Sequence, residues 1–327
     1  MAVVKSLAYG HGQVPVARAL QGHVDALAVA RMEEGAELRE AGIDCPLVVL
    51  EGPLTQDQTA LAARYELQLV LHHDHQLELL RQHVGAPLAC WLKLDTGMHR
   101  LGFVPERAQQ LLHELDGMPA VASVQLMTHL ANADDTADAT TTAQLARMQQ
   151  ACEGLPNACS VANSAGILAW PDSHADWVRP GLMLYGASPL IGKTAEQLDL
   201  QPVMTLHAPL IAINQLQAGE PVGYGGTWHA PEAMPLGVVG IGYGDGYPRH
   251  IGNGAQVLIN GRRAPLAGRV SMDMITVDLR GIQAQVGDRV TLWGEGLAAD
   301  EVAGWADTIA YTLFCGVTAR VQRRYRE

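Results

Sequence analysis

The chain has 327 residues, a hydrophobic fraction of 48% and a formal net charge of −12. This length is enough for two domains or for one large one. The acidic balance excludes a nucleic-acid-binding protein and a protein that adheres to anionic membranes, because both depend on basic patches. No uninterrupted apolar run is long enough to span a bilayer, and the opening segment, residues 1–5, is too short and too abruptly polar for a signal peptide.

The cysteine and histidine residues give no metal-binding pattern. The five cysteines are odd in number and lack metal or redox spacing, which predicts a reducing, cytoplasmic setting. The segment His72-His73-Asp74-His75 has four potential ligands, but adjacent residues point in different directions and no matching set follows. We therefore predict a polar loop after the fourth strand, and no metal site.

Short apolar runs alternate with amphipathic stretches through the first part of the chain. The amphipathic stretches predict helices, one of which begins after Gly12 while another runs through Glu33 and Glu34. Eight strands separated mostly by helices are typical of a parallel (β/α)8 barrel of the TIM type. The predicted strands are residues 1–4, 26–30, 47–50, 68–71, 89–94, 121–127, 159–162 and 177–178.

The pattern changes near residue 200, where short β-like runs punctuated by turns begin. The run 255–259 followed by Asn260-Gly261 is a strong hairpin signal, and Gly287-Asp288 before the run 290–293 is another. One helix is expected at residues 299–311. We predict an α/β fold, with a barrel domain at residues 1–200 and a mostly β domain at residues 201–327.

Lys5 is the first candidate for chemistry. It follows the first predicted strand, and in a barrel the carboxyl ends of the strands face the active site. A partly desolvated lysine at that position can lose its proton and form a Schiff base with a carbonyl cofactor. A solvated lysine that ends a strand is the alternative, so this interpretation depends on the motifs around it.

Five motifs supply that support, in a shared order and at compatible spacings. The motifs are Val3-Val4-Lys5 with Ala8-Tyr9-Gly10-His11-Gly12, Lys93-Leu94-Asp95-Thr96-Gly97-Met98-His99-Arg100-Leu101-Gly102, Asn163-Ser164-Ala165, Val178-Arg179-Pro180-Gly181 with Tyr185-Gly186, and Gly242-Tyr243-Gly244-Asp245-Gly246-Tyr247 with Gly268-Arg269-Val270-Ser271-Met272-Asp273-Met274. Together they resemble the motifs of the alanine racemases, and the resemblance covers essentially the whole chain.

The resemblance implies an isomerase that uses pyridoxal 5'-phosphate (PLP) to interconvert L-alanine and D-alanine. Lys5 is implied as the lysine that carries PLP, and Lys5 and Tyr243 as the two bases on opposite faces of the substrate. A tyrosine is a base only as the phenolate, so Tyr243 needs a neighbourhood that favours that form. His129 matches a histidine that contacts this tyrosine from the partner subunit, and Arg100 is implied to orient Tyr243 or the substrate carboxylate.

The remaining implied roles concern the cofactor and the substrate pocket. The resemblance implies that Arg179 faces the pyridine nitrogen of PLP. An arginine at that place donates a hydrogen bond without giving up its proton. Lys93 matches a family lysine that is often carbamylated. The alternative, to which we give equal weight, is an unmodified Lys93 in an ion pair with a nearby carboxylate such as Asp95. The implied phosphate site comprises Tyr9, Asn163, Ser164, Gly181, Leu182 and Tyr311. The implied substrate pocket includes Met272 and Asp273 of the other subunit of a head-to-tail homodimer with shared active sites.

Several alternatives stay open at this level. A racemase of broader substrate range differs only in the shape of the pocket, whereas Arg179 argues against a PLP-dependent decarboxylase of related fold. A third alternative is a non-catalytic PLP-binding carrier protein, but such proteins are single barrels without a β domain. A fourth is a disabled homologue, which would bind the cofactor without turnover. The D-alanine product would supply peptidoglycan, or the enzyme would serve alanine catabolism. The resemblance also predicts that the chain is missing a short N-terminal piece before Lys5.

Overall fold

The computed structural model describes residues 1–326, which form two compact units. We call the first the barrel unit; it comprises residues 1–8, 12–184 and 189–192. The second, the β-rich unit, comprises residues 9–11, 185–188 and the chain from residue 193 onwards. No helix within residues 1–326 is both long and apolar enough to cross a membrane.

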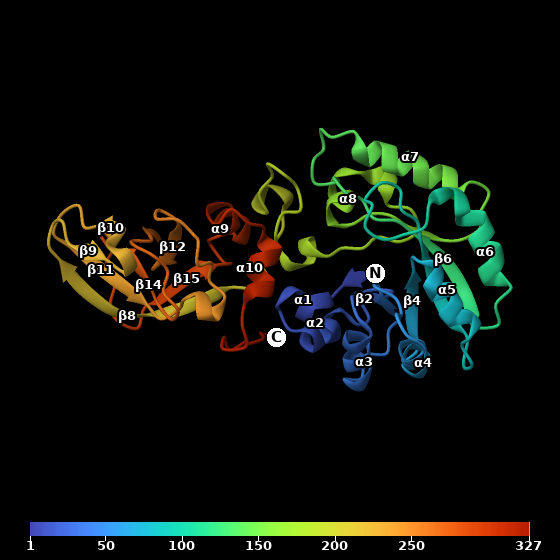
Figure 1. Ribbon diagram of the computed structural model, residues 1–327. Helices are drawn as coiled ribbons and strands as arrows, with labels where there is room; N and C mark the ends of the chain where they lie inside the picture. The colour runs from blue at the N-terminus through green and yellow to red at the C-terminus, as the bar shows by residue number, and fades with distance from the viewer. Residues whose placement is uncertain (327) are drawn as a thin grey trace. The chain divides into compact units, whose positions relative to one another are not determined.

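The barrel unit is built on seven parallel strands that pair in chain order (Figure 1). Their central residues are almost all aliphatic and buried, as expected for parallel strands that are covered on both faces. The sequence prediction of these seven strands is confirmed, with small shifts at the ends. The strands are β1 (Ala2–Val3), β2 (Leu27–Val29), β3 (Leu47–Val49), β4 (Leu67–Leu71), β5 (Leu88–Lys93), β6 (Val121–Met127) and β7 (Cys159–Ser160).

Residues 177–180 occupy the eighth position and join the two ends of the sheet. The N–H of Trp177 donates to the carbonyl of Cys159 at 3.0 Å, and the N–H of Val3 donates to the carbonyl of Pro180 at 2.9 Å. The predicted strand at residues 177–178 is therefore corrected to a single bridge between Trp177 and Ser160. Pro180 has no N–H with which to extend the ladder, which keeps this segment short.

Helices follow the strands around the outside of the barrel unit (Figure 1). The helix predicted after Gly12 and the helix predicted through Glu33 and Glu34 are both confirmed. Thr55 illustrates how these helices begin, since its hydroxyl accepts the N–H of Gln58 at 3.2 Å. The helices are α2 (Gln13–Leu20), α3 (Met32–Glu40), α4 (Gln56–Arg64), α5 (Asp74–Arg81), α6 (Ala108–Asp116), α7 (Thr140–Cys152) and α8 (Ser164–Ala169).

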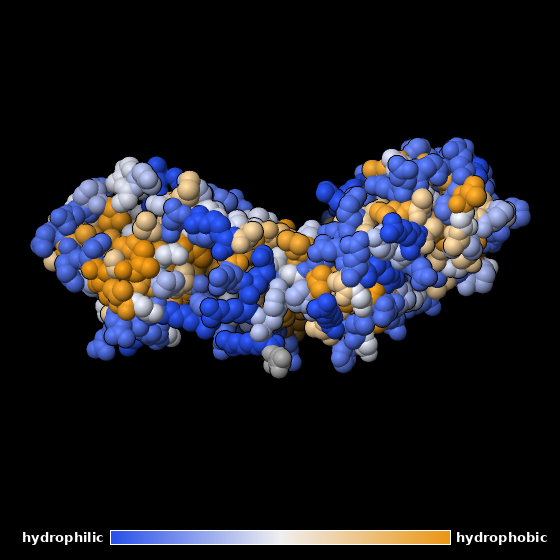
Figure 2. Space-filling view, turned by 90° about the horizontal axis from the view of Figure 1, so that it is seen from below, coloured by the Kyte–Doolittle hydropathy of each residue, from blue (hydrophilic) through white to orange (hydrophobic). Residues whose placement is uncertain are grey.

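The β-rich unit contains a six-stranded sheet and a separate two-stranded ribbon, as its sequence predicts. Figure 2 shows apolar side chains on the surface of this unit, at the left of the view. The strand order of the sheet is β13 (Arg262–Pro265), β12 (Gln256–Ile259), β15 (Arg289–Trp293), β8 (Leu206–Leu216), β11 (Met234–Val239) and β14 (Ile275–Asp278). The ribbon pairs β9 (Pro221–Val222) with β10 (Trp228–His229).

Turn residues explain one confirmed hairpin and two corrections in this unit. Asn260 and Gly261, with φ of 50° and 75°, make the tight turn between β12 and β13. Gly287 instead precedes a strand that pairs with β8 and β12, so no hairpin forms there. The single helix expected at residues 299–311 is two, α9 (Ala299–Trp305) and α10 (Ala310–Gly316), separated at Asp307, whose φ of 47° is left-handed.

Candidate active site

Lys5 stands at the carboxyl end of β1, at the start of a left-handed turn labelled α1 (Lys5–Tyr9). Ser6, Leu7 and Ala8 have φ between 51° and 54°, a conformation that costs a non-glycine residue roughly 1–2 kcal/mol. The carboxylate of Glu34 holds the turn, because its Oε1 accepts the N–H of Ser6 at 2.7 Å. Such strain persists only where the surroundings impose it, so the backbone next to Lys5 is tightly fixed.

Arg179, in the eighth barrel position, is 4% exposed and donates several hydrogen bonds. Its Nη1 donates to the hydroxyl of Ser160 at 2.6 Å, and its Nη2 donates to the carbonyls of Thr128 at 2.7 Å and Val161 at 3.0 Å. Burial lowers the pKa of Arg179 to about 10, which still leaves the guanidinium charged at neutral pH. The structure therefore fixes a buried positive charge across the ends of two adjacent strands.

His129 follows β6 and lies beside Arg179. Its Nδ1 is 3.3 Å from Nη2 of Arg179. Because an arginine nitrogen can only donate, Nδ1 is the acceptor and the proton of the neutral ring is on Nε2. Burial, and then the charges of Arg179, Lys93, Arg100 and Lys5, hold the pKa of His129 well below its usual value. His129 is thus a neutral hydrogen-bond donor through Nε2.

Lys93 is the last residue of β5 and is buried. Desolvation, followed by the charges of Arg179 and Arg100, lowers its pKa to about 7, against a smaller raising effect of Asp95. Asp95 is itself occupied by a turn, since its Oδ1 accepts the N–H groups of Gly97, Met98 and His99, each at 3.0 Å. The structure thus holds Asp95 in its own loop, and the simple ion pair that was the alternative for Lys93 is not the arrangement seen.

A buried polar network that no sequence motif predicts supports these groups. Gln144, on α7, donates from Nε2 to the carbonyl of His129 at 3.0 Å and to the hydroxyl of Thr96 at 3.3 Å. Thr96 and Thr128 join their hydroxyls at 2.8 Å. The segment that carries His129 is therefore held by the side chains of Gln144, 15 residues later, and of Thr96, which is 32 residues before Thr128.

Backbone donors converge on Ser164, the residue that opens α8. Its hydroxyl accepts the N–H groups of Gly181 at 2.8 Å and of Met183 at 3.3 Å. Asn163 caps the helix by accepting the N–H of Gly166 at 2.9 Å. Of the residues expected around a phosphate, Asn163, Ser164, Gly181 and its neighbour Leu182 are thus adjacent, and Met183 joins them. Loops after the seventh and eighth strands are a frequent phosphate site in barrel enzymes.

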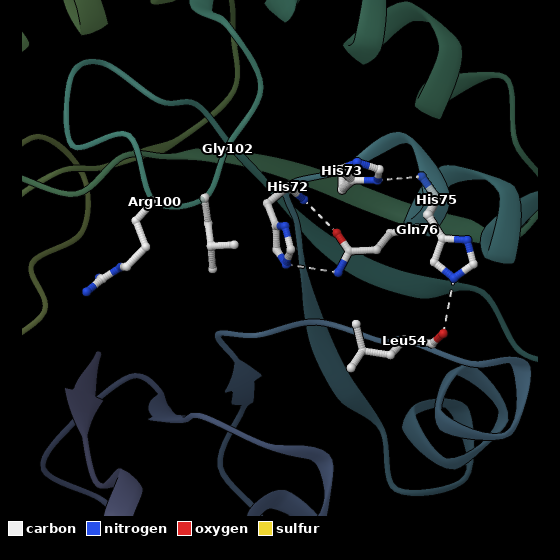
Figure 3. Close-up of a pocket in the computed structure, with 8 residues that line it drawn as sticks. Leu54, His72, His73, His75, Gln76, Arg100 and Gly102 are labelled. Carbon is white, nitrogen blue, oxygen red and sulfur yellow. Dashed lines mark hydrogen bonds between the residues drawn. The ribbon is translucent and has the colours of Figure 1, made fainter.

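Arg100 is exposed in the loop after β5 and lines a hollow of about 260 Å³ on the barrel unit (Figure 3). His72, His73 and His75 line the same hollow, and Figure 3 shows His73 and His75 on the side away from Arg100. The Nε2 of His75 is 3.1 Å from the carbonyl oxygen of Leu54. Within residues 1–326 no group of metal-ligating side chains is found. The predicted polar loop is confirmed only at His72 and His73; it was wrong for Asp74 and His75, which form the first turn of α5.

In the β-rich unit, Tyr9 and Tyr311 lie side by side. Their ring centroids are 5.4 Å apart, and the ring of Tyr185 lies 4.8 Å from that of Tyr9. Burial, and then the proximity of Tyr311 and Cys315, raises the pKa of Tyr9 far above its usual value. Tyr9 is therefore a neutral hydroxyl at any physiological pH, suited to donating a hydrogen bond.

Tyr243, Met272 and Asp273 also come together in the β-rich unit. The N–H of Tyr243 donates to the carbonyl of Ser271 at 3.1 Å, and Arg320 donates to Oδ1 of Asp273 at 2.8 Å. A side chain at Gly242 would approach the carbonyl oxygen of Ser271 to 2.2 Å, so the close contact of the two loops requires glycine there. Tyr243 is 40% exposed and Met272 is 53% exposed, so both stand at the surface of the chain.

The barrel-unit residues suit an anionic cofactor with a carbonyl group. The charges of Lys5, Lys93, Arg100 and Arg179 all act on His129, which concentrates positive potential at one end of the barrel. Donors gather at Ser164 and Gly181, and Lys5 supplies an amine. These observations fit the phosphate and aldehyde of PLP.

Comparison with known proteins identifies the family. Residues 1–189 match the model of the alanine racemase N-terminal domain, and residues 203–325 match that of the alanine racemase C-terminal domain. The chain belongs to the alanine racemase family. The activity that the motifs predict, racemisation of alanine by an isomerase, is confirmed by this membership.

Individual relatives agree over nearly the whole chain. The alanine racemase of Halorhodospira halophila (strain DSM 244 / SL1) is 52% identical over 326 residues, which are 99% of this chain and 90% of that protein. A catabolic alanine racemase of Pseudomonas putida is 47% identical over 327 residues, which are 99% of this chain and 91% of that protein. The crystal structure of the biosynthetic alanine racemase from Pseudomonas aeruginosa superposes with a TM-score of 0.97 at 45% identity, covering 100% of this chain and 92% of that one.

Proposed function

We propose that this racemase acts on alanine with PLP bound at the end of the barrel, through the site residues described above. The observation that carries the proposal is the cluster of cationic side chains around a neutral His129. Lys5 would hold the cofactor aldehyde, and Ser164 with the N–H groups of Gly181 and Leu182 would hold its phosphate. Asn163 would fix this segment, and the hydroxyls of Tyr9 and Tyr311 would add donors.

Proton transfer is assigned to two side chains on opposite faces of the substrate. When bound, PLP delocalises the negative charge left at the α-carbon after proton removal. Lys5 Nζ takes or returns the α-proton on one face, and the hydroxyl of Tyr243 does so on the other. Arg179 keeps its proton at neutral pH, so it would only donate a hydrogen bond to the cofactor ring, which would limit the charge that the ring withdraws. This limit favours racemisation over decarboxylation.

Tyr243 would come from a second copy of the chain. Its exposed position, beside the exposed Met272, supports a role at a surface that a partner covers. His129, with its proton on Nε2, would donate to the phenolate of the partner's Tyr243 and so stabilise the basic form. Arg100 would orient that tyrosine or the substrate carboxylate, and Met272 with Asp273 would complete the substrate pocket. The assembly would be a head-to-tail homodimer.

Lys93 is proposed as a carbamylation site. Only the neutral amine adds to CO₂, and a pKa of about 7 leaves much of Lys93 neutral at physiological pH. The neutral amine forms an N–C bond to CO₂ and releases one proton, so an uncharged side chain becomes an anion. The resulting carbamate would offset the charges of Arg100 and Arg179, which act on Lys93.

Two further predictions accompany this proposal, the limits of the two domains and the location of the protein in the cell. The domain limits near residue 200 (residues 1–200 and 201–327) stay a prediction, and so does a cytoplasmic location. The location is supported by the cysteines, none of which forms a disulfide within the described residues. Supply of D-alanine for peptidoglycan and alanine catabolism are both compatible with the relatives.

The test measures formation of D-alanine from L-alanine with and without added PLP, together with the absorbance of the Schiff-base band. Turnover that requires PLP, with a band that Lys5→Ala abolishes, is the expected result. A normal band in Lys5→Ala would remove Lys5 from its role. Turnover that is independent of PLP would refute the cofactor assignment.

A further inference from the structure

Two cysteine thiols meet where α7 ends and β7 begins. Cys152 is the last residue of the helix and Cys159 is the first residue of the strand. Their Sγ atoms are 3.1 Å apart, and both side chains are half-buried. A disulfide bond is about 2.05 Å long, so a movement of about 1 Å is enough to form one. Neither residue belongs to the candidate active site.

The two thiols differ in their electrostatic surroundings. The contact between the two sulfurs lowers the pKa of Cys152 and raises the pKa of Cys159. The carboxylate of Asp176, whose Oδ2 accepts the N–H of Cys159 at 2.8 Å, acts to raise both values. The Sγ of Cys159 also donates to the carbonyl oxygen of Asn157 at 3.6 Å, and the carboxylate of Asp176 lies at its backbone. Both contacts favour the thiol form of Cys159, which leaves Cys152 as the thiol that reacts with oxidants as the thiolate. Cys159 lies in contact as the second thiol.

We propose that Cys152 and Cys159 are a redox pair that forms a reversible intrachain disulfide on exposure to a peroxide. The Cys152 thiolate attacks the O–O bond, which forms an S–O bond and releases hydroxide. The sulfur of Cys159 then attacks the sulfur of Cys152, so that the S–S bond forms, the S–O bond breaks and water leaves. Two thiols are oxidised to one disulfide, and one peroxide is reduced to two waters.

The disulfide ties the end of α7 to the start of β7 and closes the loop of residues 152–159. Cross-linking restricts the unfolded chain and so stabilises the fold, and a thiol of the cell such as glutathione reverses it. The bond forms at the amino end of β7, where it leaves the side chain of Ser160 in contact with Arg179. The expected consequence is a more heat-resistant barrel unit under oxidising conditions.

The experiment oxidises the reduced, PLP-loaded protein with stoichiometric hydrogen peroxide and then alkylates the remaining thiols. Both cysteines lie in one tryptic peptide, residues 148–193, because trypsin does not cut before Pro180. We expect this peptide to be two hydrogens lighter and unalkylated, and to accept two alkyl groups after treatment with dithiothreitol. The unfolding midpoint of the oxidised protein should exceed that of the reduced protein.

Single substitutions separate the two roles. Cys159→Ser should trap a sulfenic acid at Cys152 that reacts with dimedone, and should abolish the rise of the unfolding midpoint. Cys152→Ser should leave Cys159 unmodified at the same dose, and Cys45→Ser should behave as the unmodified chain. Two alkylated thiols after peroxide, or independent over-oxidation of each cysteine without a cross-link, would overturn the proposal. Equal reactivity of Cys159 in the Cys152→Ser variant would overturn the assigned order.

Discussion

Arg179 shows at the residue scale how one side chain can serve both the fold and the site. It is buried and donates to Ser160, Thr128 and Val161, which belong to or follow two neighbouring strands. A lysine offers one nitrogen in place of a planar fork and cannot reach the same set of acceptors. The guanidinium therefore holds the ends of these two strands together, and it is also the group proposed to face the pyridine nitrogen of the cofactor.

We expect Arg179→Lys to lower the free energy of unfolding by about 2–4 kcal/mol, because it leaves buried acceptors without a donor. Alanine turnover should fall by more than about tenfold. Urea unfolding and steady-state kinetics measure the two effects. Arg18→Lys is the matched control, since Arg18 donates a single exposed bond to the carbonyl of Ala41. A stable and active Arg179→Lys variant would contradict both roles.

Lys93 makes stability depend on pH. Its pKa is about 7 in the fold, whereas an unfolded lysine titrates near pH 10.4. Between these values the unfolded chain holds a proton that the folded chain lacks, so the free energy of unfolding rises with pH. The stabilisation that neutral Lys93 provides is fully present above pH 10.4 and is lost as the pH falls through 7. The free energy of unfolding changes by at most about 1.4 kcal/mol per pH unit in this range.

The variant Lys93→Met should flatten this dependence when unfolding is measured in CO₂-free buffer, because methionine fills a similar volume without a titrating group. Identical pH profiles for the two proteins would show that Lys93 stays protonated in the fold. Loss of activity on removal of CO₂, with recovery on adding bicarbonate, would separately support the carbamate.

At the scale of elements, the left-handed turn after β1 depends on α3. Glu34, in the first turn of that helix, accepts the N–H of Ser6 through Oε1 and the N–H groups of Ala30 and Arg31 through Oε2. One carboxylate therefore caps a helix and holds a strained turn, and so fixes the backbone that carries Lys5. The helix contributes to the candidate site without touching it.

Glu34→Gln replaces one of the two acceptor oxygens by a donor, so at least one of these N–H groups loses its partner. We expect a loss of about 1–3 kcal/mol in the free energy of unfolding. A shift or broadening of the cofactor absorbance band should accompany it, since the turn beside Lys5 loosens. Glu33→Gln, at an exposed position of the same helix, should change neither quantity. Unchanged absorbance in Glu34→Gln would show that the turn holds without the carboxylate.

At the scale of the whole molecule, the proposed bases lie in different units of the chain, Lys5 in the barrel unit and Tyr243 in the β-rich unit. The exposed Tyr243 and Met272 are available to a second copy. A head-to-tail dimer would give two equivalent sites, each made from both chains. Mixed dimers of two inactive variants test this arrangement directly.

Lys5→Ala and Tyr243→Phe should each be nearly inactive alone. After mixing and re-association, half of the dimers would carry one intact site, which restores about a quarter of the unmodified activity. The mixture of Lys5→Ala with a Lys5→Ala, Tyr243→Phe double variant is the control and should stay inactive. No recovery in the first mixture, despite heterodimers detected by mass spectrometry, would show that Tyr243 does not act across subunits.

The sequence by itself determined the strands of the barrel, the hairpin at Asn260-Gly261 and the family. Short aliphatic runs and tight-turn residues act locally, and motifs such as those around Lys5 and Tyr243 keep their order along the chain. These features need no knowledge of distant contacts. The predicted eighth strand was wrong because Pro180 has no N–H with which to extend the ladder beyond a single bridge. The single helix at residues 299–311 was wrong because the left-handed Asp307 divides it.

Only the tertiary structure decided which ordinary polar residues support the site. Ser160, Thr128 and Gln144 are common residue types, and each gains a role only when folding buries it against Arg179 or against the backbone of His129. The same holds for Cys152 and Cys159, whose spacing in sequence matches no redox motif but whose sulfurs come into contact. Burial also sets the pKa of Lys93 and His129, because desolvation depends on everything that packs around a group and not on its neighbours in the chain.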